Sequence, residues 1–90
     1  MYERVLRQMR EKIRTRQYVM TLHAEEEMND DDLSIFDVER VILTGRVTER
    51  QQDLVTGEWK HLVVGRSVRE EAVAVVAKIS ITEKLVIITV

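Results

Sequence analysis

The sequence contains no cysteine and no proline, and it has only three glycines. The absence of cysteine excludes disulfides, thiolate metal sites and a cysteine nucleophile, and the absence of proline excludes a proline-rich linker. No run approaches the roughly 20 apolar residues that are needed to cross a bilayer. The N-terminal stretch MYERVLRQMREKIRTR is too charged for the hydrophobic part of a signal peptide. We therefore expect a cytoplasmic protein in which residues 1–90 form a single domain.

The charged residues are unevenly distributed, although the formal net charge is only -2. Residues 1–20 carry a net charge of +4, and residues 21–40 carry -7. In the first segment, a line of basic side chains lies away from the apolar stripe and consists of Arg7, Arg10 and Arg14. Two interpretations stay open: the basic and acidic segments pair within the fold, or they contact different partners, such as RNA phosphates and an acidic protein.

Apolar residues at helical spacing predict three helices in the first half of the chain. These helices cover about residues 2–16, 22–29 and 34–44. The short stretch QYVMTL between the first two is interpreted as an extended connector. Thr21 is expected to cap the second helix, Ser34 and Asp37 form a capping-box pattern at the third, and Gly45 is expected to end it.

From Gly45 onward the apolar pattern changes to the period of β-strands. The predicted strands cover about residues 46–52, 58–64, 72–79 and 85–90. Short loops between consecutive strands favour an antiparallel meander. The sequence therefore predicts an α+β fold, in which about three N-terminal helices pack on a four-stranded antiparallel sheet.

The run YVMTLHAEEEMNDDDLSIFDVERVILTG, followed by VTERQQD, GEWKHLVVG, VVAKI and KLVIITV, resembles a prokaryotic family of small domains of unknown function. Members of that family carry T-L-H-A at a helix start and I-I-T-V in the last strand. The resemblance covers about residues 18–90. Relatives are often encoded beside small zinc-finger antitoxins, and their order of helices and strands is similar to that of the RelE-like ribonuclease toxins.

This resemblance implies a RelE-like, metal-independent endoribonuclease without a cofactor, which acts on RNA or on the ribosome and binds a small antitoxin-like protein. Two positions depart from the commoner family pattern: Glu27 stands where many relatives have arginine, and the sequence ends at Val90 where many have a further aromatic residue. Both departures favour the alternative, a non-catalytic module that binds a small partner protein or a second copy through an edge strand.

His23 is the candidate catalytic residue, because an imidazole can act as a general acid or base near neutral pH. The alternative is that its ring packs under the sheet and bonds a backbone carbonyl. His23 and Glu27 lie four residues apart on one helical face, a spacing that suits a metal pair. A third ligand would have to come from His61 or from residues 30–32, so a solvated acidic face is the favoured interpretation and no metal is expected.

Arg50, Lys60 and Lys78 are the candidate substrate-binding residues, because cations stabilise the negative charge of a phosphate in its transition state. Arg50 and Lys60 are expected to face each other across the first hairpin. The competing interpretation is ordinary surface charge, with Lys78 at a strand end and its amine in water. Trp59 suits either stacking on a base or a place at the sheet edge.

Overall fold

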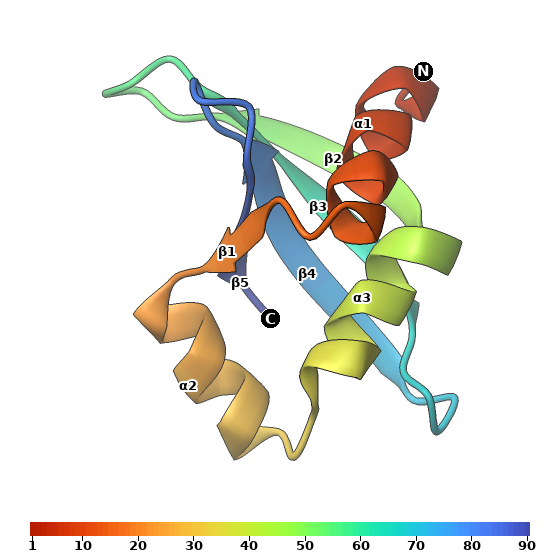
Figure 1. Cartoon of the computed structure of the whole chain (residues 1–90). Coiled ribbons are helices and arrows are strands. Elements are labelled where there is room, and N and C mark those ends of the chain that lie inside the picture. The colour runs from red at the N-terminus through yellow and green to blue at the C-terminus, as the bar shows by residue number, and fades with distance from the viewer.

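The computed structural model describes all residues from 1 to 90 and contains three helices and five strands (Figure 1). In chain order these are α1 (Glu3–Arg14), β1 (Tyr18–Met20), α2 (Leu22–Asp30), α3 (Ile35–Thr44), β2 (Arg46–Gln52), β3 (Trp59–Arg66), β4 (Ala72–Ile79) and β5 (Leu85–Thr89). The fold is of the α+β class, as predicted. None of the helices has the length and apolar character that crossing a membrane requires.

The strands form one mixed sheet in the order β1-β5-β4-β3-β2. The strands β2 to β5 pair antiparallel with their chain neighbours, whereas β1 pairs parallel with β5, from Tyr18 opposite Leu85 to Met20 opposite Ile87. The prediction of a four-stranded antiparallel meander is therefore wrong, because the stretch QYVMTL contains a fifth strand. Three residues are too few to display an alternating pattern, and their partner lies far along the chain, so local periodicity carries no signal for this pairing.

The helices α1 and α3 pack on one face of the sheet and form the core with it (Figure 1). The fully or nearly fully buried apolar side chains of the core are Met9, Ile13, Ala24, Val38, Val41 and Ile42 from the helices and Val63, Val75, Ala77, Leu85 and Ile87 from the strands. Burial of one Val, Leu, Ile or Met side chain contributes about 1.5–3 kcal/mol. The strand residues between these buried positions point to the opposite face of the sheet, away from α1 and α3.

Helix α3 ends where its last turn meets β3. Gly45 follows the helix, as predicted, but its φ of -83° is not left-handed. A Cβ atom at this position would lie 2.4 Å from the carbonyl oxygen of Val64 and 2.5 Å from that of Val41. Glycine is therefore required by the close approach of two backbones, and not by an unusual backbone conformation.

The carbonyl groups at the end of α3 are satisfied by a side chain of α1. The Nε atom of Arg10 donates to the carbonyl of Ile42 at 3.0 Å, and its Nη2 atom donates to the carbonyl of Gly45 at 2.9 Å. Such carbonyls lack partners within the helix, and a cation is favourable beside them. Of the two interpretations of the arginine line in α1, a contact within the fold therefore holds for Arg10, although it contacts carbonyls and not acidic side chains.

The start of α3 carries the predicted capping box. Asp37 Oδ2 accepts a hydrogen bond from the backbone N–H of Ser34 at 2.8 Å, and its Oδ1 accepts one from the N–H of Val68, also at 2.8 Å. The second bond ties α3 to the loop between β3 and β4. These backbone hydrogen bonds lower the pKa of Asp37, because they stabilise the ionised carboxylate.

Candidate functional site

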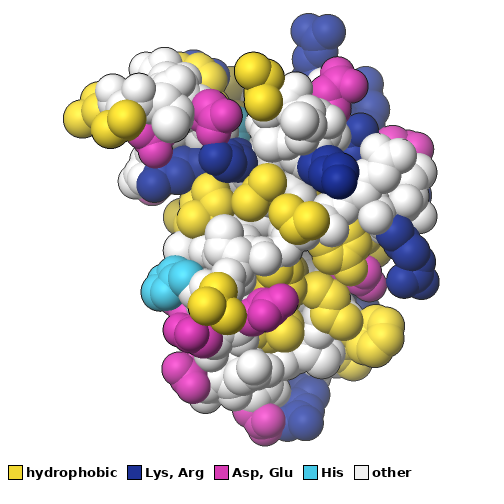
Figure 2. Space-filling model, turned by 60° about the vertical axis from the view of Figure 1, so that its left-hand side comes forward, with side chains coloured by type: hydrophobic (Ala, Val, Ile, Leu, Met, Phe, Trp, Pro, Cys, Tyr) yellow, Lys and Arg dark blue, Asp and Glu magenta, His cyan; other side chains and the backbone are white.

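The face of the sheet away from α1 and α3 carries a mixture of basic and apolar side chains. Alternate residues of the two central strands point to this face, namely Lys60, Leu62, Val64 and Arg66 of β3 and Ala72, Ala74, Val76 and Lys78 of β4. Val86 and Ile88 of β5 continue the apolar part, and both are half-buried. Figure 2 views the molecule from the side of β1 and α2 and shows hydrophobic side chains across the middle, Lys and Arg mixed with acidic side chains above them, and mostly acidic side chains below.

A cavity of about 220 Å³ lies at one end of this face. Its lining residues are Thr21, Asp53, Glu58, Lys60, Lys78, Val86 and Ile88. Two of the three predicted substrate-binding residues, Lys60 and Lys78, therefore lie together. They occupy neighbouring positions on adjacent strands, because the antiparallel register that pairs His61 with Ala77 continues to them.

The two lysines differ in their electrostatic surroundings. Lys78 Nζ donates to Glu58 Oε2 at 2.5 Å, and only 28% of the lysine side chain is exposed. Lys78 lies near the end of β4, as the surface-charge interpretation expects, but its amine is paired with Glu58 instead of standing free. Lys60 takes part in none of the four ion pairs of the structure. An anion that enters the cavity would meet the unpaired ammonium of Lys60 and would compete with Glu58 for Lys78.

The start of α2 lies beside the same cavity, because its cap residue Thr21 lines it. Thr21 Oγ1 accepts a hydrogen bond from the N–H of Ala24 at 3.0 Å and donates one to the carbonyl of Ile88 at 2.9 Å. The predicted cap is confirmed, and it also fixes the start of α2 on β5. The N-terminus of a helix presents unpaired N–H groups and the positive end of the helix dipole, so it favours anions nearby.

His23 lies in the first turn of α2, and its side chain is 66% exposed. The alternative that this ring packs under the sheet is therefore wrong. His23 Nε2 lies 3.1 Å from Glu27 Oε1, and the same carboxylate oxygen accepts a hydrogen bond from the N–H of Val90 at 3.3 Å. Glu27, which departs from the family pattern, thus connects the histidine to the strand β5. An imidazole held by a carboxylate is a recurring arrangement for proton transfer.

The third predicted substrate-binding residue, Arg50, does not join the lysines. Its register partner is His61, whereas Lys60 lies opposite Gln51. Arg50 therefore points to the helix-covered face, where its guanidinium lies 4.3 Å from the ring centroid of Trp59. The expected pairing of Arg50 with Lys60 is wrong by one residue, and a slip of one residue in a strand reverses the face. The contact of Trp59 is a cation–π interaction within the sheet.

The second histidine was considered in the sequence only as a distant metal ligand, yet it is the more unusual of the two. His61 is 7% exposed, its ring meets that of Tyr2 edge-on at 6.2 Å, and its Nδ1 atom has no hydrogen-bond partner. Burial, with a smaller effect of the positive charge of Arg50, lowers the pKa of His61. Because side chains alternate along a strand, His61 lies on the same face as the buried Val63. Burial of His61 could therefore have been predicted from the sequence.

Residues 20–90 match the family described as Domain of unknown function (DUF4258). The chain belongs to this family. No curated protein and no solved structure matches the chain. The resemblance to a family of small, uncharacterised domains is thus confirmed, and DUF4258 covers all of α2 and α3, the strands β2 to β5 and the candidate site.

The acidic residues of this DUF4258 chain do not assemble around the histidine. The structure contains no group of three His, Asp or Glu side chains close enough to hold one metal ion. Residues 30–32 therefore supply no third metal ligand to the pair of His23 and Glu27. His23 is not among the residues that line the cavity with Lys60 and Lys78, although Thr21, two residues before it, is. An exposed imidazole next to a carboxylate suits proton transfer.

Proposed function

We propose that this DUF4258 chain is a metal-independent ribonuclease of the toxin type, with His23 as its acid–base residue. The observation that carries the proposal is the pair of His23 and Glu27, 3.1 Å apart. The imidazole is exposed to a substrate, and the carboxylate that orients it is itself held by the N–H of Val90. A base that is oriented by a third group is the general pattern of enzymes that activate a hydroxyl.

The proposed reaction is an intramolecular transesterification of RNA. His23 accepts the proton of a ribose 2′-hydroxyl, the 2′-oxygen forms a bond to the adjacent phosphorus, and the bond from phosphorus to the 5′-oxygen breaks. The leaving oxygen takes up a proton from His23 or from water, so the imidazole returns to its starting state. The products are a 2′,3′-cyclic phosphate and a 5′-hydroxyl end.

Lys60 and Lys78 are proposed to bind the phosphate that reacts. Negative charge grows on the phosphoryl oxygens in the transition state, and a cation already fixed beside them stabilises that charge more than it stabilises the ground state. The start of α2 adds its positive dipole end to the same cavity. Arg50 has no part in this proposal, because it lies on the other face of the sheet.

The proposal includes a RelE-like relationship and a small antitoxin-like protein as partner, and both rest on the resemblance of the sequence motifs. The element order that supports the relationship is three helices, with β1 between the first two, followed by the antiparallel strands β2 to β5. A partner protein that covers the cavity would block access to Lys60 and Lys78. The ribosome would supply part of the geometry if the RNA is cleaved while bound to it.

Induced expression in a bacterium tests this function. Wild type is compared with His23→Ala and with Glu26→Ala, an exposed neighbour on the same helix, after both variants are shown to be folded by circular dichroism. We expect growth arrest and fragmented RNA with wild type and Glu26→Ala, and relief of both with His23→Ala. Normal growth and intact RNA with folded wild type would reject the proposal.

The second candidate is a non-catalytic interaction module. The observation that favours it is the half-buried apolar strip of Leu62, Val76, Val86 and Ile88 on the face away from α1 and α3. Such a strip suits the surface of a partner protein. Wild type that associates with the product of a neighbouring small gene in solution, without any effect on RNA, would support this candidate over the ribonuclease.

A further inference from the structure

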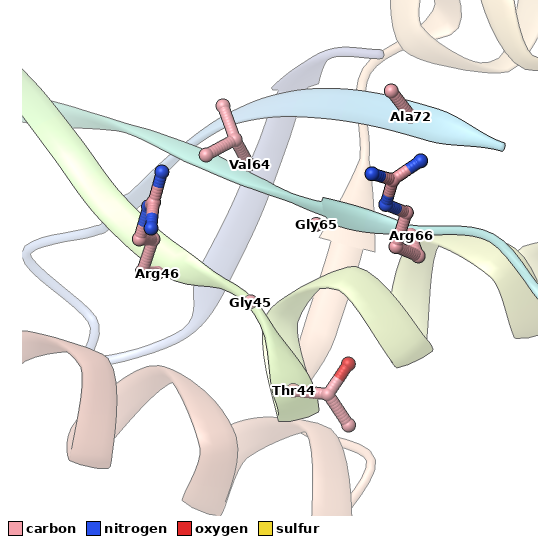
Figure 3. A pocket seen from close by; sticks show the side chains of 7 residues that line it. All are labelled: Thr44, Gly45, Arg46, Val64, Gly65, Arg66 and Ala72. Atoms are coloured by element: carbon pink, nitrogen blue, oxygen red, sulfur yellow. The ribbon is translucent and has the colours of Figure 1, made fainter. Parts of the chain in front are cut away.

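A second cleft, of about 420 Å³, lies at the other end of β3 from Lys60 (Figure 3). It is formed where α3 gives way to β2 and where β3 and β4 approach their connecting loop. Its lining residues are Thr44, Gly45, Arg46, Val64, Gly65, Arg66 and Ala72. Figure 3 shows Arg46 and Arg66 on either side of Val64, and both side chains rise from the strands on the same side as Val64.

The charge of this cleft is positive and unopposed. No acidic residue lines it, and neither Arg46 nor Arg66 takes part in any of the four ion pairs. Arg66 Nη1 donates to the backbone carbonyl of Glu70 at 3.2 Å, which holds the side chain without neutralising it. The carboxylate of Glu70 pairs instead with Arg40, at 3.2 Å. Two unneutralised guanidinium groups around one cleft are the arrangement that binds a phosphate or carboxylate.

Packing explains the glycines of this cleft but not its arginines. Gly45 is required by the close carbonyl oxygens of Val64 and Val41, and a Cβ on Gly65 would lie 3.1 Å from Gly45 Cα. As a consequence, Gly45 and Gly65 contribute only backbone to the part of the cleft between Arg46 and Arg66. The arginines stabilise no neighbouring acid, so the fold itself does not account for both of them.

We propose that Arg46 and Arg66 form a second phosphate-binding subsite for a single RNA strand, and this proposal rests on the ribonuclease function proposed above. Lys60 and Arg66 lie on the same face of β3 and are six residues apart, a distance of about 20 Å at 3.3 Å per residue. Leu62 and Val64 lie between them on that face. One strand of RNA can thus run along β3, with phosphates at its two basic ends and bases over the apolar middle.

A phosphodiester strand fits this face better than an acidic peptide does. The basic groups stand at the two ends, and the segment between them is apolar, which suits a ligand whose charges and flat apolar surfaces alternate. Acidic side chains also occur near the catalytic end, namely Asp53 and Glu58. These carboxylates oppose any anion at that end, an RNA phosphate included, whereas the cleft at Arg46 and Arg66 has no such residue.

The test measures binding of a fluorescein-labelled single-stranded RNA whose 2′-hydroxyls are methylated, so that no cleavage occurs. Fluorescence anisotropy is recorded over a series of salt concentrations for wild type, for the double variant R46Q/R66Q and for the control R4Q/R14Q. The control removes two exposed arginines of α1 and changes the net charge equally. Each phosphate that is no longer neutralised lowers the slope of log K against log salt by about 0.7 for a single strand, so loss of this one subsite is expected to lower it by about 0.7 in R46Q/R66Q alone.

The outcomes separate this subsite from the ribonuclease itself. The subsite is rejected if R46Q/R66Q has the same slope and affinity as wild type. It is also rejected if wild type does not bind the methylated RNA, or binds a polyglutamate peptide more tightly than that RNA. Cleavage of unmodified RNA is measured in parallel. If wild type binds RNA through Arg46 and Arg66 but cleaves none, the subsite is supported and the ribonuclease function is rejected. If R46Q/R66Q binds and cleaves RNA as well as wild type does, the ribonuclease function is supported and the subsite is rejected.

Discussion

The Nε2 atom of His23 lies 3.1 Å from Oε1 of Glu27, one helical turn further along α2. The same oxygen accepts a hydrogen bond from the backbone N–H of Val90, so the carboxylate links α2 to the residue that follows β5. An exposed histidine on a helix would otherwise sample several rotamers, each with a different direction for its free nitrogen. The contact with Glu27 favours those rotamers that keep Nε2 beside the carboxylate.

Glu27→Gln is therefore expected to reduce RNA cleavage, because an amide orients the imidazole without stabilising its positive charge. We expect the rate to fall by up to about 100-fold, the lower end of what a positioned acid–base group contributes. The measurement is kcat separately from KM on a short RNA, with Glu26→Gln as the matched control. Binding of methylated RNA is expected to stay unchanged, and equal rates in the two variants would contradict a positioning role for Glu27.

His61 gives the fold a dependence on pH. Its folded pKa is lowered, mainly by burial, so the unfolded chain binds the proton more readily than the folded chain. The contribution of His61 to stability is thus complete above about pH 6.5, the pKa of a free histidine, and decreases as the pH falls below that value. The ring of His61 meets that of Tyr2 edge-on, Arg50 is its register partner on β2, and Nδ1 has no hydrogen-bond partner.

Urea denaturation between pH 8 and pH 5 measures this dependence. The free energy of unfolding of wild type is expected to decrease over that range, and His61→Leu is expected to show a smaller decrease. His23→Leu is the control, because its side chain is exposed. Equal slopes in wild type and His61→Leu would show that the histidine is not responsible.

Asp37 is expected to be the acidic residue whose loss destabilises the fold most. Its carboxylate accepts backbone hydrogen bonds from Ser34 and Val68, both at 2.8 Å. Asp37→Ala removes a helix cap, worth about 0.5–2 kcal/mol, and also frees the loop that holds Val68. Because the folded pKa of Asp37 is lowered, its contribution is present above about pH 4 and is lost as the pH falls further.

Thermal or urea unfolding of Asp37→Ala, with the exposed Asp30→Ala as control, checks this prediction. The difference between Asp37→Ala and wild type is expected to be largest at neutral pH and to shrink as the pH falls below about 4, the pKa of a free aspartate. Similar stability of the two alanine variants at pH 7 would refute the bridging role of Asp37.

Gly45→Ala is expected to destabilise the fold more than Gly65→Ala. The new Cβ at Gly45 would lie 2.4 Å from a backbone oxygen of Val64, whereas the nearest atom at Gly65 is 3.1 Å away. Relief requires α3 and β3 to move apart, and overpacking of this kind costs typically about 1–3 kcal/mol. The denaturation midpoints of the two variants show which of them is less stable. A Gly45→Ala variant as stable as wild type would contradict the close approach of α3 and β3 at Gly45.

The sequence predicted those parts of the fold that depend on local pattern. The three helices, the capping box at Ser34 and the strands after Gly45 all follow from spacing and cap chemistry. The strand at Tyr18–Met20 could not be predicted, because its only partner is β5 at the far end of the chain. The contact of Arg10 with the end of α3 could not be predicted either, because it joins residues far apart in the sequence and no local pattern marks it.

The candidate site was predicted in part, for a comparable reason. Lys60 and Lys78 were grouped correctly, since antiparallel hairpins bring alternate residues of neighbouring strands together. Arg50 was placed on the wrong face because the bulge between Val47 and Glu49 shifts the register of β2. A bulge of one residue leaves no mark in a polar strand, where neither face has an apolar pattern.

Analysis of RNA ends tests the central claim most directly. Purified wild type and His23→Ala are incubated with free RNA and with ribosome-bound messenger RNA in the presence of EDTA, and the new ends are identified chemically. The account predicts 2′,3′-cyclic phosphate and 5′-hydroxyl ends with wild type and their loss with His23→Ala. Intact RNA in both settings with folded wild type, or equal cleavage by His23→Ala, would contradict it.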